Sequence, residues 1–85
     1  MSENQNLLIK GLLYKSNYRG CKETDILVGK YANEFLSKMN DVDLELFQKF
    51  IDEDDAYIYD WILEKSTCPT QYQELIIKIR EFHDL

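Results

Sequence analysis

Residues 40–62 read NDVDLELFQKFIDEDDAYIYDWI, and this stretch decides the fold class. Asn40 and Asp41 are short polar residues of the kind that cap the start of a helix. An apolar stripe follows and predicts a helix to about Asp52. The acidic run 52–55 predicts a break and a new cap, because carboxylates are favourable at a helix N-terminus. The next helix is expected to end near Ser66. The inward residues of these two helices are expected to be Leu46, Phe47, Phe50 and Ile51, then Ile58, Trp61 and Ile62.

Helical periodicity continues on both sides of this stretch. Helices are expected over 4–17, 22–39 and 70–82, the last behind a T-x-x-Q capping box that begins at Thr70. Their inward faces are expected to hold Leu8, Leu12 and Lys15 in the first, Leu27, Val28, Tyr31, Ala32, Phe35 and Leu36 in the second, and Tyr72, Leu75, Ile76 and Ile79 in the last. One proline and three glycines are too few for the turns of an all-β fold. The sequence predicts an all-α fold, a single small five-helix bundle in one domain over residues 1–85, with Phe47, Phe50, Ile58 and Trp61 in its core.

Length and composition limit the class of protein. The chain has 85 residues, of which 45% are apolar and 13% aromatic, so it is too short for a large enzyme scaffold and too apolar for a disordered segment. The net charge of −6 argues against nucleic acid as a partner, because phosphate binding needs a basic surface. Residues 1–40 carry a balance of +2 and residues 41–85 one of −8. Two solvated faces would explain this asymmetry, and so would a docking face in the first half.

The chain shows no feature of a targeting signal or a membrane span. Its first residues lack the basic and apolar regions of a signal peptide, and its apolar runs are far shorter than a bilayer requires. Cys21 and Cys68 lie far apart without metal-type spacing, so two free thiols are expected. These features predict a cytoplasmic protein of bacterial source that is not inserted in a membrane and is a monomer when free.

No constellation of catalytic or metal-binding residues is recognisable. A calcium loop that begins at Asp52 would need glycine and glutamate where Tyr57 and Leu63 stand. The single histidine, His83, lies near the end of the chain and has no serine or cysteine partner at a recognisable spacing. We expect no catalytic residue, no metal site and no tightly bound cofactor, and therefore no enzyme.

The segment Arg19-Gly20-Cys21-Lys22-Glu23 is the exception, because it places an arginine and a glycine in a turn and a glutamate at a helix start. One interpretation is a capped turn with an exposed ion pair between Arg19 and Glu23, which would contribute little to stability. The other is a docking motif whose charged side chains project from a rigid helix start. Composition alone favours the first.

The same segment resembles the Arg-Gly-x-x-Glu motif of the SdhE family, small assembly factors for the flavoprotein subunit of succinate dehydrogenase. The resemblance extends over nearly the whole chain, through Leu46-Phe47-Gln48-Lys49-Phe50-Ile51 and the aspartate-to-tryptophan segment from Asp55 to Trp61. Three positions depart from the family pattern. Tyr18 stands where many relatives have a second arginine, Thr24 replaces a leucine and Ala56 a proline.

The resemblance implies a five-helix bundle that binds this flavoprotein and promotes covalent attachment of FAD to it. Arg19, Gly20, Glu23 and Asp25 would be the partner-binding residues, FAD would be attached to the partner, and fumarate reductase is a second candidate client. An antitoxin-like regulatory interaction module is the alternative that remains open, and a pull-down would distinguish the two by the partner it returns.

Overall fold

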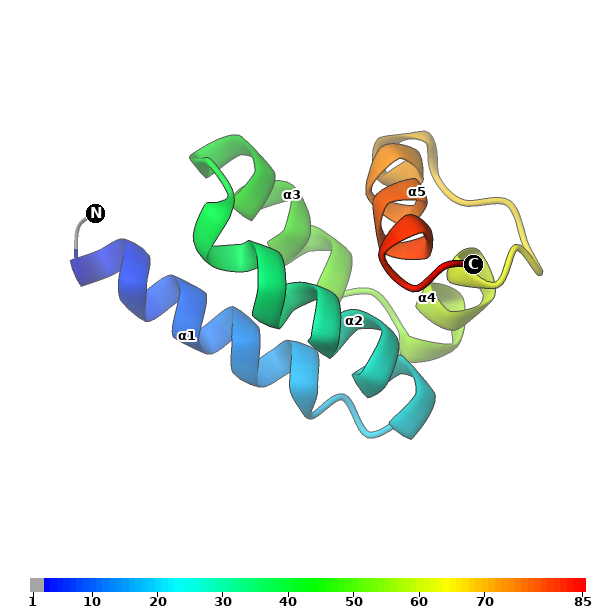
Figure 1. Ribbon diagram of the computed structural model, residues 1–85, viewed down its shortest axis with the longest axis horizontal. Coiled ribbons are helices and arrows are strands. Elements are labelled where there is room, and N and C mark those ends of the chain that lie inside the picture. The colour runs from blue at the N-terminus through cyan, green and yellow to red at the C-terminus, as the bar shows by residue number, and fades with distance from the viewer. Residues whose placement is uncertain (1–2) are drawn as a thin grey trace.

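The structure is a computed structural model that describes residues 3–85, with side chains from Asn6 onward, and every element in this range is helical (Figure 1). The elements are α1 (Glu3–Asn17), α2 (Lys22–Phe35), η1 (Leu36–Lys38), α3 (Asp41–Ile51), α4 (Asp55–Ile62), η2 (Thr70–Tyr72) and α5 (Gln73–Phe82), where η marks a 3-10 helix. The predicted all-α fold with five α-helices is confirmed.

Helix α2 is the centre of the arrangement. It runs antiparallel to α1 and also contacts α4 and α5, which pack on each other (Figure 1). Helix α3 contacts α1, so the five helices enclose one core. The turn between α1 and α2, which contains the Arg-Gly-x-x-Glu motif, lies at the end of this helix pair that is far from the N-terminus (Figure 1).

The inward faces of α2, α4 and α5 are those that the periodicity predicts. Val28, Ala32 and Leu36 are fully buried on the α2 side, while Leu27 and Phe35 are half-buried at its edge. On α4 the buried residues are Ile58, Trp61 and Ile62, and the last segment buries Tyr72, Leu75, Ile76 and Ile79. Phe47, Phe50, Ile58 and Trp61 all lie in the core, and the ring of Phe50 packs against Trp61 and Tyr72 with centroids 6.3 and 5.3 Å apart.

The inward face of α1 differs from the predicted one by a rotation of about one residue. Ile9, Leu12 and Ser16 are buried, whereas Leu8 is 36% exposed and Lys15 reaches outward to Asp52 with 3.8 Å between Nζ and Oδ1. In α3 the fully buried leucine is Leu44, and Leu46 lies at the edge. The physical reason is the close approach of α2, because the Cβ position of Gly29 lies 3.2 Å from the carbonyl oxygen of Ser16 and the side of α1 that carries the small Ser16 therefore faces α2. The small Ser16 also satisfies its own hydroxyl by donating to the carbonyl of Leu12 at 2.7 Å.

The predicted caps at the two starts of the central stretch are confirmed. The side chain of Asn40 accepts from the N–H of Asp43 at 2.8 Å, and that of Asp54 accepts from the N–H of Ala56 at 2.9 Å. Each bond satisfies a backbone donor that has no partner inside its helix.

Three predicted boundaries are wrong. Helix α4 ends at Ile62 rather than near Ser66, because Glu64 adopts a left-handed φ of 60° and the guanidinium of Arg80 donates to the carbonyl of Ile62. Helix α2 does not reach Met39 but gives way to the 3-10 turn η1 after Phe35. The capping box at Thr70 is replaced by the 3-10 turn η2, and neither η2 nor α5 has a side-chain cap.

The close approach of α1 and α2 depends on a residue without a side chain. Gly29 is buried on α2, and a Cβ there would lie 2.6 Å from Oδ1 of Asn17 and 3.2 Å from the carbonyl oxygen of Ser16. The first of these atoms belongs to a side chain, but the second is backbone and cannot move without shifting α1. Gly29 therefore sets the spacing between the two helices that carry the motif.

A second constraint joins the turn between α1 and α2 to the turn between α3 and α4. The Nε atom of Arg19 lies 2.5 Å from Oδ1 of Asp55, and its Nη2 donates to the carbonyl oxygen of Glu53 at 2.8 Å. The Arg19 side chain is only 7% exposed and that of Asp55 25%. The predicted exposed pair between Arg19 and Glu23 is therefore wrong, because the guanidinium turns inward and makes two charge-assisted bonds to a different loop. We call this set of contacts the Arg19 latch.

Substitution of the buried glycine should separate the two helices. We expect Gly29→Ala to lower the free energy of unfolding by about 1–3 kcal/mol, because the methyl group overpacks the contact. Gly11→Ala is the matched control. Gly11 is exposed in the middle of α1 with nothing within 4 Å of its Cβ position, so alanine there should raise the same free energy by about 0.5–1 kcal/mol. Urea denaturation measures both, and a Gly29→Ala variant as stable as the original chain would contradict the spacing argument.

Loss of the Arg19 latch should be costly. We expect Arg19→Ala to lower the free energy of unfolding by about 1–3 kcal/mol, since it leaves the Asp55 carboxylate and the Glu53 carbonyl without their donor. Arg19→Lys keeps the charge but not the planar fork, and should recover only part of that loss. A double-mutant cycle with Asp55→Ala, followed by urea denaturation, measures the coupling. A coupling energy near zero would show that the two side chains do not stabilise each other.

Candidate functional site

The turn between α1 and α2 is held in shape by its own backbone and by Asp25. The backbone N–H of Arg19 donates to Oδ1 of Asp25 at 2.5 Å, across six residues of chain. The carbonyl of Cys21, the N-cap residue of α2, accepts from the N–H of Asp25 at 2.9 Å. Asp25 thus closes the turn from the helix side, while the Arg19 latch holds it from the α3–α4 side.

Gly20 provides the change of direction in this turn. Its φ is +92°, a conformation that side-chain-bearing residues rarely adopt, whereas nothing lies within 4 Å of its Cβ position. The requirement for glycine is therefore conformational rather than a matter of crowding within the chain. Because Gly20 is also exposed, its bare backbone is open to close approach by another molecule.

Glu23 projects from the first turn of α2 into solvent. A carboxylate at this position is stabilised by the positive end of the helix dipole. The thiol of Cys21 donates to Oε2 of Glu23, with Sγ 3.5 Å away. Its side chain is thus exposed on a helix start whose direction is fixed by the turn.

The structure divides the four predicted partner-binding residues into two pairs. Gly20 in the turn and Glu23 in the first turn of α2 are both exposed, whereas Arg19 and Asp25 are half-buried and bind other parts of the same chain. Arg19 and Asp25 therefore act as positioning residues in this geometry. That the set binds a partner stays a prediction of the sequence.

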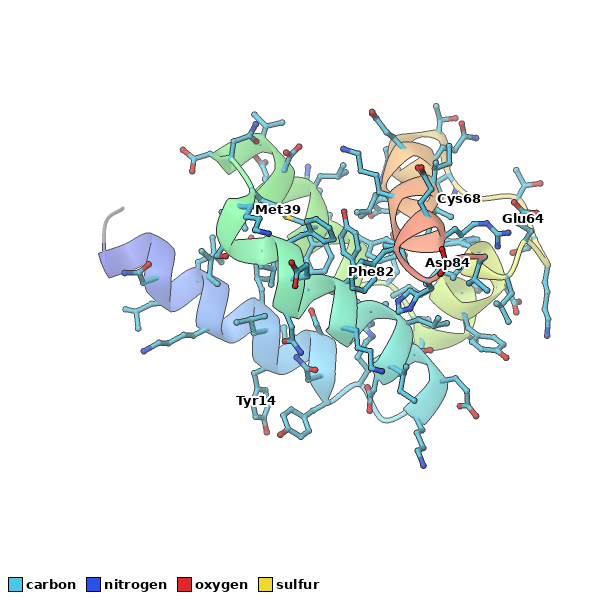
Figure 2. The ribbon with its side chains drawn as sticks, viewed as in Figure 1. Tyr14, Met39, Glu64, Cys68, Phe82 and Asp84 are labelled. Carbon is cyan, nitrogen blue, oxygen red and sulfur yellow. The ribbon has the colours of Figure 1, made fainter. Side chains whose placement is uncertain are left out.

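The other side chains that could carry chemistry lie in structural positions. His83 is half-buried, and its Nε2 lies 2.7 Å from the carbonyl oxygen of Leu27. Burial raises the pKa of the Cys68 thiol, which keeps it protonated; this residue lies in the loop before α5 (Figure 2). Cys21 is also a free thiol.

Among the described residues, no three His, Cys, Asp or Glu side chains gather as metal ligands. None of the described helices is long and apolar enough to cross a bilayer.

Two features of the site were missed by the sequence reasoning. The first is the role of Asp55, which the sequence assigns to a helix cap and to the aspartate-to-tryptophan segment but which is the ion-pair partner of Arg19. The two residues are 36 positions apart, so no local pattern links them. The second is the exposed pair Tyr14 and Tyr18, whose i, i+4 spacing does place both rings on one side of α1.

Comparison with known proteins gives a family match over most of the chain. The family described as flavinator of succinate dehydrogenase matches residues 10–83. Among individual relatives, the mitochondrial succinate dehydrogenase assembly factor 2 of Dictyostelium discoideum is 32% identical over 76 residues, which is 89% of this chain and 54% of the relative. The protein of the same name from Yarrowia lipolytica is 36% identical over 75 residues, 82% of this chain and 52% of the relative. The Aspergillus flavus protein is 46% identical over 50 residues, 59% of this chain and 17% of the relative.

The length and the names of these relatives both bear on how the chain is interpreted. The chain spans about half of the length of the Dictyostelium and Yarrowia proteins and less of the Aspergillus one. All three are named as mitochondrial, which contradicts the cytoplasmic location expected from the sequence and gives no support to a bacterial source. The expectation was wrong because it rested on the absence of a recognisable signal.

The match over residues 10–83 contains the Arg-Gly-x-x-Glu turn and the segment from Asp55 to Trp61, and the resemblance to the SdhE family is therefore confirmed. The chain belongs to the family described as flavinator of succinate dehydrogenase.

Proposed function

We propose that this protein is an assembly factor that binds the flavoprotein subunit of succinate dehydrogenase and promotes covalent attachment of FAD to it. Family membership supports succinate dehydrogenase as the enzyme that is assembled and attachment of the flavin as the result. The observation that carries the docking site is the exposed pair Gly20 and Glu23 on a turn that Arg19 and Asp25 fix from within. The names of the relatives favour a mitochondrial setting.

The proposed mechanism is stabilisation of one arrangement of the partner. Covalent flavinylation needs a histidine of the flavoprotein and the flavin ring to be held in near-attack geometry, and the flavoprotein supplies both reacting groups. A factor that binds this arrangement better than others increases its population by its differential affinity. This chain then contributes binding energy and no catalytic group, and FAD is carried by the partner.

The fixed turn suits that task. Glu23 offers a carboxylate for a charge-assisted contact, and Gly20 offers exposed bare backbone in the turn that precedes α2. Because the turn is already rigid, little conformational entropy is lost when it docks. The antitoxin-like alternative has no feature of the fold that favours it, and the family match argues for the flavoprotein.

Substitution of Glu23 should separate docking from folding. We expect Glu23→Ala to weaken affinity for the flavoprotein by about 30-fold or more, because a charged contact is lost from a desolvated interface. The free energy of unfolding should fall by no more than about 1 kcal/mol, since the side chain is exposed. Isothermal titration calorimetry measures the affinity, and fluorescence of covalently bound flavin in a denaturing gel measures flavinylation, which should fall in parallel.

Glu45→Ala is the matched control, because Glu45 is an exposed glutamate on α3 and its loss changes the net charge equally. It should leave binding and flavinylation unchanged. If Glu23→Ala lowers stability sharply while the folded fraction binds normally, the motif is structural and the docking proposal is wrong. Repeating the titration with the flavoprotein of fumarate reductase decides whether that enzyme is a second client.

A further inference from the structure

The outward face of α1 carries an exposed aromatic pair next to the motif. Tyr14 is 67% exposed and Tyr18 71% exposed, and their ring centroids lie 4.8 Å apart. The N–H of Tyr18 donates to the carbonyl of Tyr14 at 3.1 Å, so the last turn of α1 fixes both residues relative to each other. Tyr14 points outward from the helix (Figure 2). Leu7, one heptad before Tyr14, is 64% exposed and extends the same face.

A shallow hollow of about 470 Å³ lies beside this pair. Its lining residues are Lys10, Leu13, Tyr14, Asn17, Tyr18 and Asn33. The amide of Asn17 donates to the carbonyl of Leu13 at 2.7 Å and to Oδ1 of Asn33 at 3.1 Å, so this part of the lining is held in place by the chain's own bonds. Lys10 supplies the one charged side chain of the lining. We call Tyr14, Tyr18 and this hollow the tyrosine surface.

The size of a protein interface requires the docking site to extend beyond the turn. Stable complexes bury about 800 Å² on each partner, from roughly 20–30 residues, and Gly20 with Glu23 can supply only a small part of that area. Tyr18 directly precedes Arg19 in the chain, so the tyrosine surface is continuous with the turn. The acidic residues 52–55 also lie near the turn, through the Arg19 latch, but their charge is costly to desolvate.

We propose that the tyrosine surface is the second half of the flavoprotein-binding face, and that it receives an apolar ridge of the partner with carboxylates on the side facing Lys10. This inference rests on the proposed function. Tyrosine is enriched among the residues that dominate binding energy, because it buries a large ring while its hydroxyl stays hydrogen-bonded. The two rings are in contact and held by the last turn of α1, so the pair loses little further freedom on docking. Lys10 contributes mainly to orientation and to the rate of association.

The test is the affinity of the full chain for the purified flavoprotein subunit, measured by isothermal titration calorimetry. The double variant Tyr14→Ala with Tyr18→Ala should bind at least about 30-fold more weakly. Its midpoint of thermal unfolding should stay close to that of the original chain, since both side chains are exposed. The variant Tyr14→Phe with Tyr18→Phe keeps the rings and should retain most of the affinity.

The control variant is Val42→Ala with Ile77→Ala, which removes two exposed apolar side chains from α3 and α5. It should bind as the original chain does. If Glu23→Ala weakens binding but the double alanine variant of the tyrosines does not, the tyrosine surface is outside the interface and the inference is overturned, while the proposed function stands. If the original chain does not bind the flavoprotein at all, the proposed function fails and the inference fails with it.

Discussion

The contact between Arg19 and Asp55 is the interaction on which the rest of the structure depends, because it joins two loops that local sequence does not bring together. Helix packing alone would leave the turn between α1 and α2 free to pivot at Gly20, where the backbone adopts a left-handed conformation. The guanidinium removes that freedom by binding Asp55 and the Glu53 carbonyl at once. Tyr72 extends the same network, since its hydroxyl donates to Glu53 at 3.0 Å.

This arrangement gives the residues of one motif different tasks. Arg19 and Asp25 make hydrogen bonds within the chain and hold the turn in one conformation. Gly20 and Glu23 are therefore exposed to solvent in a fixed orientation. A charged side chain in a short motif is therefore not automatically a contact with a partner. The exposed fraction of the side chain decides whether it can contact a partner. The Arg19 side chain is only 7% exposed, which is closer to a core residue than to a surface one.

The inward faces could be predicted wherever the apolar spacing is strong, as in α4 and α5, because burial of those side chains dominates the local energetics. Prediction failed where another force decides. In α1 the small Ser16 and the approach of Gly29 rotate the helix away from the face that leucines alone suggest. In α4 the end is set by Arg80, which lies 18 residues beyond the carbonyl that it binds. The motif could be recognised from sequence, but the partner of its arginine could not, since Asp55 is one carboxylate among four in a row.

The separation of Arg19 from its partners has a consequence for the order of events during synthesis. The complete Arg-Gly-x-x-Glu segment leaves the ribosome well before Asp55, and Tyr72 follows later still. A nascent chain therefore contains all residues of the motif before it contains the carboxylate that fixes the turn. The latch can form only after Asp55 has been translated, 36 residues behind Arg19, so synthesis of the motif and fixation of its turn are separate events.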